Sequence, residues 1–356
     1  MKAQVAIIDL EKTSSNPVEE AIKLLGGIDD LDTTSREVAL KVGIYHPDGT
    51  MYSTPEIVDK IVQAFKRTPK VNIVETDNYI DGGMERLRKV YSDIFSDRIV
   101  PVNLSKVQNT VSIHVENSVR EIVIELARSV MKPTVFVNTH VLRTYNRGSI
   151  LKNLFGLPPE KKKAPYHKNE IFYNLLTGLF EAIGGVDLSI LDGTYLHKFS
   201  KGRSVQAEMN LIVVGRDAVA VETVGAHLAG LKPEKMQIIQ SFVKKGLGIG
   251  NLEDIEILGA RLEDMEKRYK VAKKIAEKKI KKLPEPWSAA KTINKLIDAG
   301  FFSVERRTLD TVIAACIEQD PRAHGKKKML YTTMRRRLKQ GKVQGEKLAG
   351  EWVFWN

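Results

Sequence analysis

The stretch 37–77 reads "EVALKVGIYHPDGTMYSTPEIVDKIVQAFKRTPKVNIVETD" and contains a complete strand–helix–strand pattern. Its two ends, 37–45 and 70–77, are rich in β-branched residues, which predicts two short strands. Between them, Thr54 and Pro55 are residue types preferred at a helix N-cap and at the first helical position. Apolar residues then recur at helical spacing, at Ile57, Ile61, Val62 and Phe65. This order predicts a βα unit with parallel strands.

The same alternation continues on both sides of this unit. Further strands are predicted at 4–10, 99–105, 133–140, 188–193 and 211–216. A second helix is predicted at 171–185, where apolar residues at helical spacing end in a Gly-Gly pair. Residues 1–260 are therefore expected to form an α/β domain with a mainly parallel sheet flanked by helices.

The composition is that of a globular protein. Of 356 residues, 42% are hydrophobic and 28% are charged, and the length suggests two domains. No apolar run reaches the roughly 18 residues of a membrane span, and acids come too early for a signal peptide. We therefore expect a cytoplasmic protein with no membrane partner. The single cysteine, Cys316, excludes disulfides, cysteine-rich zinc sites and cysteine-ligated iron–sulfur clusters within one chain, and we expect it to be a buried small residue.

The net charge of +12 comes from the last part of the chain. Residues 1–260 carry 32 basic and 32 acidic side chains. Residues 261–287 carry 10 basic and 5 acidic side chains, and residues 288–356 carry 14 and 7. Such an asymmetry indicates a separate module with an anionic partner.

The basic part begins with one charged helical pattern, which predicts a helical linker at 261–287. Three short helical patterns and a strand pair follow in 288–356, the order of a small winged helix-turn-helix-like domain. The cations expected to contact DNA or RNA there are Lys326, Lys327, Lys328, Arg335, Arg336, Arg337 and Lys342. Two alternatives stay open, because winged helices also bind proteins and lysine-rich helices are often only solvated.

In open parallel sheets, ligands bind outside the carboxyl ends of the strands. The polar residues at the ends of the predicted strands are Lys41, Glu75, Asp77, Asn138, His140, Asp192, Arg216 and Asp217. This rim is therefore the predicted ligand site. The alternative is that strand-to-helix loops are simply polar, and that Asp217 caps the helix beginning at Ala218.

The stretch 149–168, "SILKNLFGLPPEKKKAPYHK", follows the predicted strand 133–140. Its Lys152 and Asn153 lie in a short helical segment that Gly156 and a Pro-Pro pair end. Both side chains are therefore expected near the rim rather than on a long exposed helix.

A lysine at position 152 supplies a positive charge for a phosphate or carboxylate, and Arg143 could add a bidentate contact. The triple lysine at 161–163 is interpreted as a solvated loop. His140 and His167 also fall near the rim, although histidines at such positions are more often structural or surface residues.

Standard catalytic signatures are absent from the sequence. "SKGRS" lacks the full P-loop spacing, no G-x-G-x-x-G joins a first strand to a helix, and no H-E-x-x-H occurs. Asp192, Asp217 and Glu222 could form a carboxylate set, so metal binding stays open. Catalytic residues, metals and cofactors are therefore unassigned.

Several blocks, among them "ALKVGIYHPDGTMYSTPEIVDKIVQAF", "TVFVNTHVLRTY", "LKNLFGLPP", "ILDG" and "GRDAVAVETVGAHLAG", occur in the order found in the DUF362 family, a domain of unknown function. The resemblance covers roughly Val38 to Gly259. It implies a family site lined by Asn138, Lys152, Asn153, Gly156, His167, Asp192, Gly193, Asp217 and Glu222.

The chain departs from the family pattern at three places. Arg143-Thr144-Tyr145 stands where the family often has Lys-Thr-His, and "TYLHKFSKGRS" replaces a Gly-Pro-rich loop after "ILDG". With one cysteine, the chain cannot carry the ferredoxin-like module of some members. Residues 288–356 lie outside the resemblance.

Two functions follow from these patterns. The first is a pocket protein that binds a small anionic molecule, a phosphate or a carboxylate, at the rim; whether it is an enzyme stays open. The second is a ligand-sensing regulator that binds DNA or RNA through the basic carboxyl-terminal domain.

Overall fold

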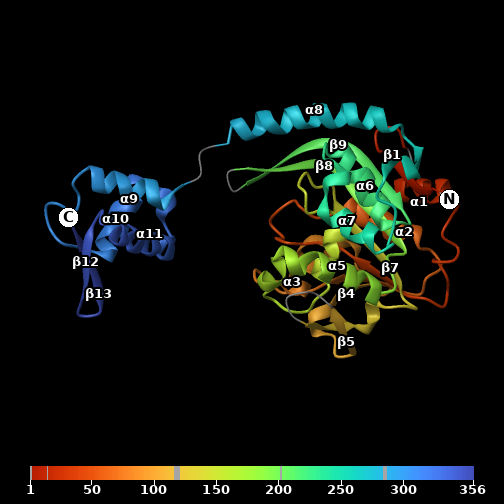
Figure 1. Ribbon diagram of the computed structural model, residues 1–356, viewed down its shortest axis with the longest axis horizontal. Helices are drawn as coiled ribbons and strands as arrows, with labels where there is room; N and C mark the ends of the chain where they lie inside the picture. The colour runs from red at the N-terminus through yellow and green to blue at the C-terminus, as the bar shows by residue number, and fades with distance from the viewer. Residues whose placement is uncertain (1, 14, 116–120, 201–202, 284–286) are drawn as a thin grey trace. The chain divides into compact units, whose positions relative to one another are not determined.

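The computed structural model describes residues 2–13, 15–115, 121–200, 203–283 and 287–356 (Figure 1). The chain divides into two compact units, Met1–Lys282 and Leu283–Asn356. The first unit contains the predicted mixed α/β fold, with a large, mostly parallel sheet flanked by helices.

Eight strands form this sheet in the order β10-β1-β9-β8-β7-β2-β3-β4. Their bounds are β1 (Ala3–Asp9), β2 (Val38–Lys41), β3 (Val71–Glu75), β4 (Ile99–Asn103), β7 (Val135–Val141), β8 (Leu188–Ser200), β9 (Arg203–Gly215) and β10 (Ile255–Gly259). The strands from β4 to β8 pair in parallel, as do β1 and β10. β4, β3, β2, β7 and β8 thus all run in one direction, as the sequence predicts for a mainly parallel sheet.

β9 runs against its neighbours, which corrects one part of the prediction. It pairs antiparallel with both β8 and β1, and its last residue, Gly215, lies opposite Ser189 at the start of β8. Arg216 and Asp217 therefore leave the sheet at the edge where the parallel strands begin. They cannot belong to the rim formed by the carboxyl ends of those strands.

Helices cover both faces of the sheet, and their bounds are α1 (Pro17–Leu24), α2 (Pro55–Ala64), α3 (Gly83–Tyr91), α4 (Ile150–Asn153), α5 (Asn169–Ala182), α6 (Ala218–Leu228) and α7 (Gln237–Lys244). α2 begins as predicted, since Thr54 accepts a hydrogen bond from the Ile57 amide. Side chains from α1, α2 and α3 pack with alternate strand residues, such as Leu40 and Ile73, in one buried core. α6 packs against β8, β9 and β1.

Three strands of the first unit were not predicted: β10 at the edge of the large sheet, and two strands outside that sheet. β5 (Thr110–Val115) and β6 (Ile122–Ala127) form a separate antiparallel pair that packs against α5. Their alternation of buried and exposed residues is that of a half-buried ribbon.

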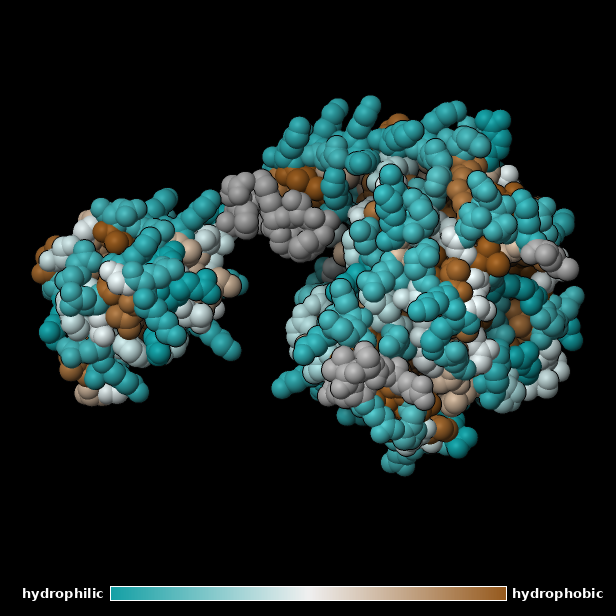
Figure 2. All heavy atoms as spheres, viewed as in Figure 1, coloured by the Kyte–Doolittle hydropathy of each residue, from teal (hydrophilic) through white to brown (hydrophobic). Residues whose placement is uncertain are grey.

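α8 (Leu262–Lys281) is the helix that the sequence assigns to a linker. It packs along β8 and β9 within the first unit (Figure 1). Glu277 pairs with Lys198 at 2.8 Å, and Lys279 Nζ donates to the Gln206 carbonyl at 2.7 Å. Hydrophilic side chains cover most of its outer side (Figure 2). Met265, Ala272 and Ala276 are buried, whereas Val271 and Ile275 are exposed.

The second unit has three helices and a small sheet. Its elements are α9 (Ala289–Asp298), β11 (Arg307–Thr308), α10 (Leu309–Gln319), α11 (Lys327–Lys339), β12 (Gln344–Leu348) and β13 (Glu351–Trp355), with strand order β11-β13-β12. Ile293, Leu330 and Phe354 form its core with Cys316. Cys316 is fully buried, as expected, and burial raises the pKa of its thiol to about 11.

In the part of the chain that the structure describes, no helix is both long and apolar enough to cross a membrane.

Candidate functional site

A pocket of about 320 Å³ lies at the carboxyl ends of β2, β3 and β7. Six cationic side chains line it, and Glu75 is the one carboxylate among its lining residues. The cations are Lys41, Arg86, Arg143, Lys152, Lys161 and Lys163. Three parallel strands and the connection after β7 therefore converge on a positively charged pocket at the predicted rim.

The deep wall of the pocket is formed by Lys41, Glu75 and Arg86, all of which are buried. Lys41 Nζ donates to both carboxylate oxygens of Glu75 at 3.2 Å and to the Val42 carbonyl. Arg86 Nη1 lies 3.9 Å from Glu75, and its guanidinium donates to the carbonyls of Ile44 and Thr76. The Glu75 carboxylate also accepts hydrogen bonds from the amides of Ile44 and Thr76 at 2.9 Å. The two cations of the deep wall thus share one carboxylate and several backbone groups, although Arg86 Nε is buried without a hydrogen-bond partner.

Asn153 joins the ends of two strands to α4. Its amide nitrogen donates to Asn138 Oδ1 at 2.8 Å and to the Thr139 carbonyl at 3.0 Å. Its amide oxygen lies 3.5 Å from Lys41 Nζ. Asn138 in turn donates to the Ile150 carbonyl at 2.9 Å. The two asparagines therefore hold α4 in place, and Asn153 lines the pocket while Asn138 lies behind it.

Two glycines allow the walls to approach closely. A Cβ atom at Gly156 would lie 2.8 Å from Lys41 Nζ, and one at Gly43 would lie 2.3 Å from both Asn153 and His140. Because these neighbours are themselves held by hydrogen bonds, any larger residue would push the walls apart. The predicted site residue Gly156 thus acts through its small size.

The outer wall of the pocket is formed by Arg143 and Lys152, which lie close to Tyr145. Arg143 donates to Tyr145 Oη and to His140 Nε2, both at 2.6 Å. Its Nε is buried and has no hydrogen-bond partner. No carboxylate of the described residues lies within ion-pair distance of Arg143. Burial, together with Arg143, holds the pKa of His140 well below its usual range, so His140 is neutral and accepts this hydrogen bond.

Lys152 is the most isolated cation of the pocket. Within the described ranges it makes neither a hydrogen bond nor an ion pair, and its Nζ lies 5.8 Å from the Tyr145 ring centroid. Burial lowers the pKa of Lys152 to about 7, and Arg143 and Arg147 add to this effect by repulsion. Its ammonium group is thus destabilised by a site that offers it no counter-ion.

Lys163 belongs to the pocket, which corrects the interpretation of 161–163 as a solvated loop. Its Nζ donates to Thr76 Oγ1 at 3.1 Å and to the Asp77 carbonyl at 2.9 Å. Burial lowers its pKa to about 8. Lys161 lines the pocket and lies 3.9 Å from Asp77, but it is exposed, as is Lys162, so the interpretation is corrected for Lys163 alone.

Aromatic side chains complete the pocket. Tyr45 and Tyr79 are exposed at its lining, with ring centroids 6.0 Å apart and their hydroxyls in contact. Phe155 lies below them, and His167 packs on it with a centroid distance of 4.6 Å. A ligand would therefore meet cations on the walls and flat rings at the opening.

The predicted carboxylate set does not form. Asp192 accepts hydrogen bonds from the amides of Thr54 and Thr194, so it supports the start of α2. Asp217 caps α6 and also accepts from the Ile249 amide. None of the three acids lines the pocket, and no cluster of three or more metal-ligating side chains is found among the described residues.

Glu222 is buried in α6 and does not face solvent. It accepts hydrogen bonds from the amides of Ser149 and Leu151, each at 2.9 Å. It therefore positions the segment that carries Lys152. Gly193 is likewise structural, because a Cβ there would lie 2.6 Å from Leu211 on the paired strand.

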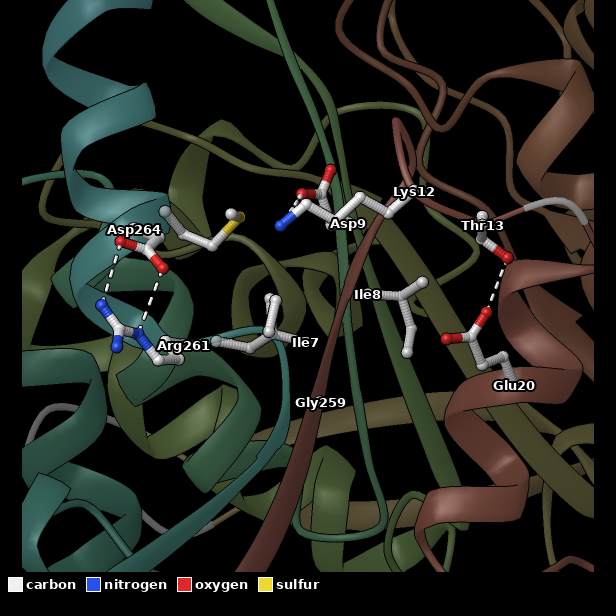
Figure 3. A pocket seen from close by; sticks show the side chains of 11 residues that line it. Ile7, Ile8, Asp9, Lys12, Thr13, Glu20, Gly259, Arg261 and Asp264 are labelled. Carbon is white, nitrogen blue, oxygen red and sulfur yellow. Dashed lines mark hydrogen bonds and ion pairs between the residues drawn. The ribbon is translucent and has the colours of Figure 1, made fainter.

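A second hollow, of about 590 Å³, lies between β1, α1 and the start of α8 (Figure 3). Its charged groups already have partners. Arg261 donates to Asp264 at 3.1 Å, and Thr13 donates to Glu20 at 2.6 Å. Asp9 accepts from Arg268, which lies outside the hollow. Its polar groups bind one another, so the pocket at β2, β3 and β7 is the stronger candidate.

Sequence reasoning missed Arg86 and the tyrosines. Arg86 lies in "MERLRKVY", a helix whose charged residues read as a solvated face, and only the fold turns it inward. Tyr45 and Tyr79 lie in the loops that follow β2 and β3, so their place near the ends of the predicted strands was the signal that could have found them.

In the second unit, the predicted nucleic-acid-binding residues differ in how exposed they are and in whether they have partners. Lys326, Lys328, Arg336 and Lys342 are exposed. Lys327 pairs with Asp310 at 2.8 Å, and the Arg335 guanidinium lies 4.8 Å from the Trp352 ring centroid. Arg337 is buried and donates to Asn294 and Gln340, so it stabilises the unit and is not available to a phosphate.

A family model described as a domain of unknown function, DUF362, matches residues 38–227. A search of curated proteins finds no match to the chain. The matched span contains every residue that lines the pocket. Since it covers more than half of the 356 residues, the chain belongs to the DUF362 family.

Proposed function

We propose that the pocket of this DUF362 protein binds a small anionic ligand with a flat apolar part. The observation that carries the proposal is the outer wall, where Arg143 and Lys152 are largely withdrawn from water and no described carboxylate forms an ion pair with them. Glu222 attracts Arg143 only from beyond ion-pair distance. Burying a charge without compensation is costly. An anionic ligand would supply the missing compensation.

The shape of the pocket narrows the class of ligand. A volume of about 320 Å³ suits a small metabolite rather than a polymer. Arg143 presents an unpartnered Nε, and a guanidinium is suited to carboxylates and phosphates. The rings of Tyr45, Tyr79 and Phe155 favour a planar or aromatic group next to the anion.

Thermal-shift measurements with aromatic carboxylates, sugar phosphates and nucleotides test this proposal. A ligand at about 100 times its Kd should stabilise the protein by roughly 2.7 kcal/mol. The shift should be lost in Arg143→Met and kept in Lys162→Met, which removes an exposed lysine of the same loop. A panel without any stabilising anion, or a shift that Arg143→Met leaves unchanged, would contradict the proposal.

We propose as a second function that residues 288–356 form a winged-helix domain that contacts nucleic acid. Three helices, a short strand between the first two and a carboxyl-terminal hairpin support this assignment. Lys326 and Lys328 at the start of α11, Arg336 within it and Lys342 after it are exposed and thus available to phosphates. Binding of the full chain to duplex DNA should weaken steeply with salt, and affinity that is independent of salt would overturn this function.

A further inference from the structure

We propose that Lys152 forms an imine with an anionic ligand that carries a carbonyl group, of which 2-oxo acids are the simplest class. This inference rests on the proposed anion pocket and adds a covalent step to it. The lysine would act as a nucleophile, whereas the anion-binding proposal needs only its charge.

The four lysines of the pocket differ in what occupies their amino groups. Lys41 donates to Glu75, Lys163 donates to Thr76 and Asp77, and Lys161 lies 3.9 Å from Asp77. Over the described residues, Lys152 alone among them has no hydrogen bond and no ion pair. Its nitrogen is therefore the one that a ligand can reach without first breaking a bond inside the protein.

The guanidinium of Arg143 lines the same pocket as this amine, and its charge is close enough to lower the pKa of Lys152. Lys152 Nζ and Arg143 Cζ lie 5.8 Å and 5.4 Å from the centroid of the same Tyr145 ring. In a 2-oxo acid, the carbonyl carbon is bonded directly to the carboxylate carbon. A carboxylate held by Arg143 thus keeps the electrophilic carbon inside the pocket that Lys152 also lines.

The surroundings also favour the nucleophilic form of the amine. Burial and the repulsion from Arg143 and Arg147 lower the pKa of Lys152 to about 7. A lysine that is withdrawn from water next to other cations is a recognised form of activated amine. A large fraction of Lys152 is therefore neutral near neutral pH.

The reaction balances without an added oxidant or reductant. The Lys152 Nζ lone pair attacks the carbonyl carbon, and the π electrons of the carbonyl move to oxygen. The nitrogen loses two protons and the oxygen gains two, so one water leaves as the carbon–nitrogen double bond forms. The product keeps its carboxylate next to Arg143.

Two matched probes separate the covalent step from anion binding. Phenylpyruvate has a carboxylate, an aromatic ring and a carbonyl, and phenyllactate has a hydroxyl in place of the carbonyl. The full chain is incubated with each acid and sodium cyanoborohydride, which reduces an imine to a stable amine. Intact mass and peptide mapping then measure the adduct, and thermal shift measures binding.

Three variants complete the test. We expect a phenylpyruvate adduct at Lys152 and none with phenyllactate, although both acids should stabilise the protein. Lys152→Met should lower labelling at least tenfold and Lys162→Met should not change it. Lys152→Arg keeps the positive charge, so it should still bind phenyllactate but form no adduct.

The outcomes distinguish the two proposals. If both acids stabilise the protein but no adduct forms at position 152, the imine is wrong and the anion pocket stands. If labelling in the Lys152 variants equals that of the unmodified chain, the reactive lysine lies elsewhere and the imine is also wrong. If neither acid stabilises the protein, both this inference and an aromatic carboxylate as the ligand are wrong.

Discussion

The two walls of the pocket both contain buried cations, but they differ in how the charge is compensated. In the deep wall, Lys41 and Arg86 surround Glu75, and backbone amides and carbonyls complete the network. In the outer wall, the Arg143 guanidinium donates to the neutral groups of Tyr145 and His140, and Glu222 attracts it only from beyond ion-pair distance. Lys152 forms no hydrogen bond among the described residues. Compensated charges at the end of a sheet hold the walls together, whereas uncompensated ones reduce stability until a ligand binds.

The strongest test of this difference removes the carboxylate of the deep wall. Glu75→Gln leaves Lys41 and Arg86 buried without a counter-ion, and we expect a loss of about 3–5 kcal/mol in the free energy of unfolding. Urea denaturation measures it. Glu181→Gln is the control, because its pair with Lys245 is half exposed and should cost at most about 1 kcal/mol. If Glu75→Gln and Glu181→Gln lower the free energy of unfolding by similar amounts, Glu75 does not stabilise the deep wall as proposed.

The outer wall should respond in binding rather than in folding. Arg143→Met removes a charged donor to the ligand, and we expect about tenfold to hundredfold weaker binding of an anionic ligand, since such hydrogen bonds are worth about 1.5–3 kcal/mol. Calorimetric titration measures the affinity. Without ligand, Arg143→Met should lower the free energy of unfolding by less than Glu75→Gln does. A loss of stability as large as that of Glu75→Gln would place Arg143 with the structural charges.

Lys152→Met should stabilise the free protein. The pKa of Lys152 is about 7 in the folded chain, below its ordinary value of 10.5, so folding disfavours its proton. This penalty is complete below pH 7 and disappears as pH rises from 7 to 10.5, because only the unfolded chain then stays protonated. The gain from Lys152→Met should therefore be largest at pH 6, at about 1–3 kcal/mol, and vanish near pH 10.5.

Denaturation at several pH values checks this result, with Lys162→Met as an exposed control that should show no such gain. A gain that is independent of pH would point to better packing by methionine, and a loss at pH 6 would show that Lys152 has a compensating partner.

The second unit provides the smallest expected effect. Here too, some cations are bonded within the protein and others are available to a ligand. Arg337 is buried and hydrogen-bonded, whereas Arg336 is exposed. Arg336→Ala in the full chain should change stability by less than about 0.5 kcal/mol. It should reduce the salt slope of duplex binding by about one. Arg337→Met should instead destabilise the unit, and an unchanged slope in Arg336→Ala would remove that residue from the interface.

Local patterns were sufficient to predict much of the first unit. The strands at 37–45 and 70–77 and the capped helix between them follow from residue types that act over a few positions. The direction of β9 cannot be predicted from such residue types, because an antiparallel strand can have the same apolar pattern as a parallel one. The long arms of β8 and β9 were missed because polar residues such as Lys198 interrupt their apolar pattern.

The candidate site was predictable where it depends on strand ends. Lys41, Glu75, Lys152 and Asn153 come together because parallel strands finish at one edge. Asp217 was placed at that edge only on the assumption that β9 is parallel. Lys163 could not be separated from its two lysine neighbours, because the three share a sequence context and differ only in which carbonyls they meet after folding. Whether these residues bind a ligand stays a prediction.

Asn153 and Lys152 are neighbours in sequence, but within the described chain only the side chain of Asn153 is hydrogen-bonded to the rest of the fold. The amide of Asn153 holds the segment to the ends of β7 and β2, whereas the amine of Lys152 forms no hydrogen bond among the described residues. A designer could therefore exchange Lys152 or Phe155 to accept other chemical groups while the asparagine keeps the backbone in register. Selectivity and foldability are thus encoded by adjacent residues that can be varied separately, which makes this segment a natural starting point for directed evolution of new ligand preferences.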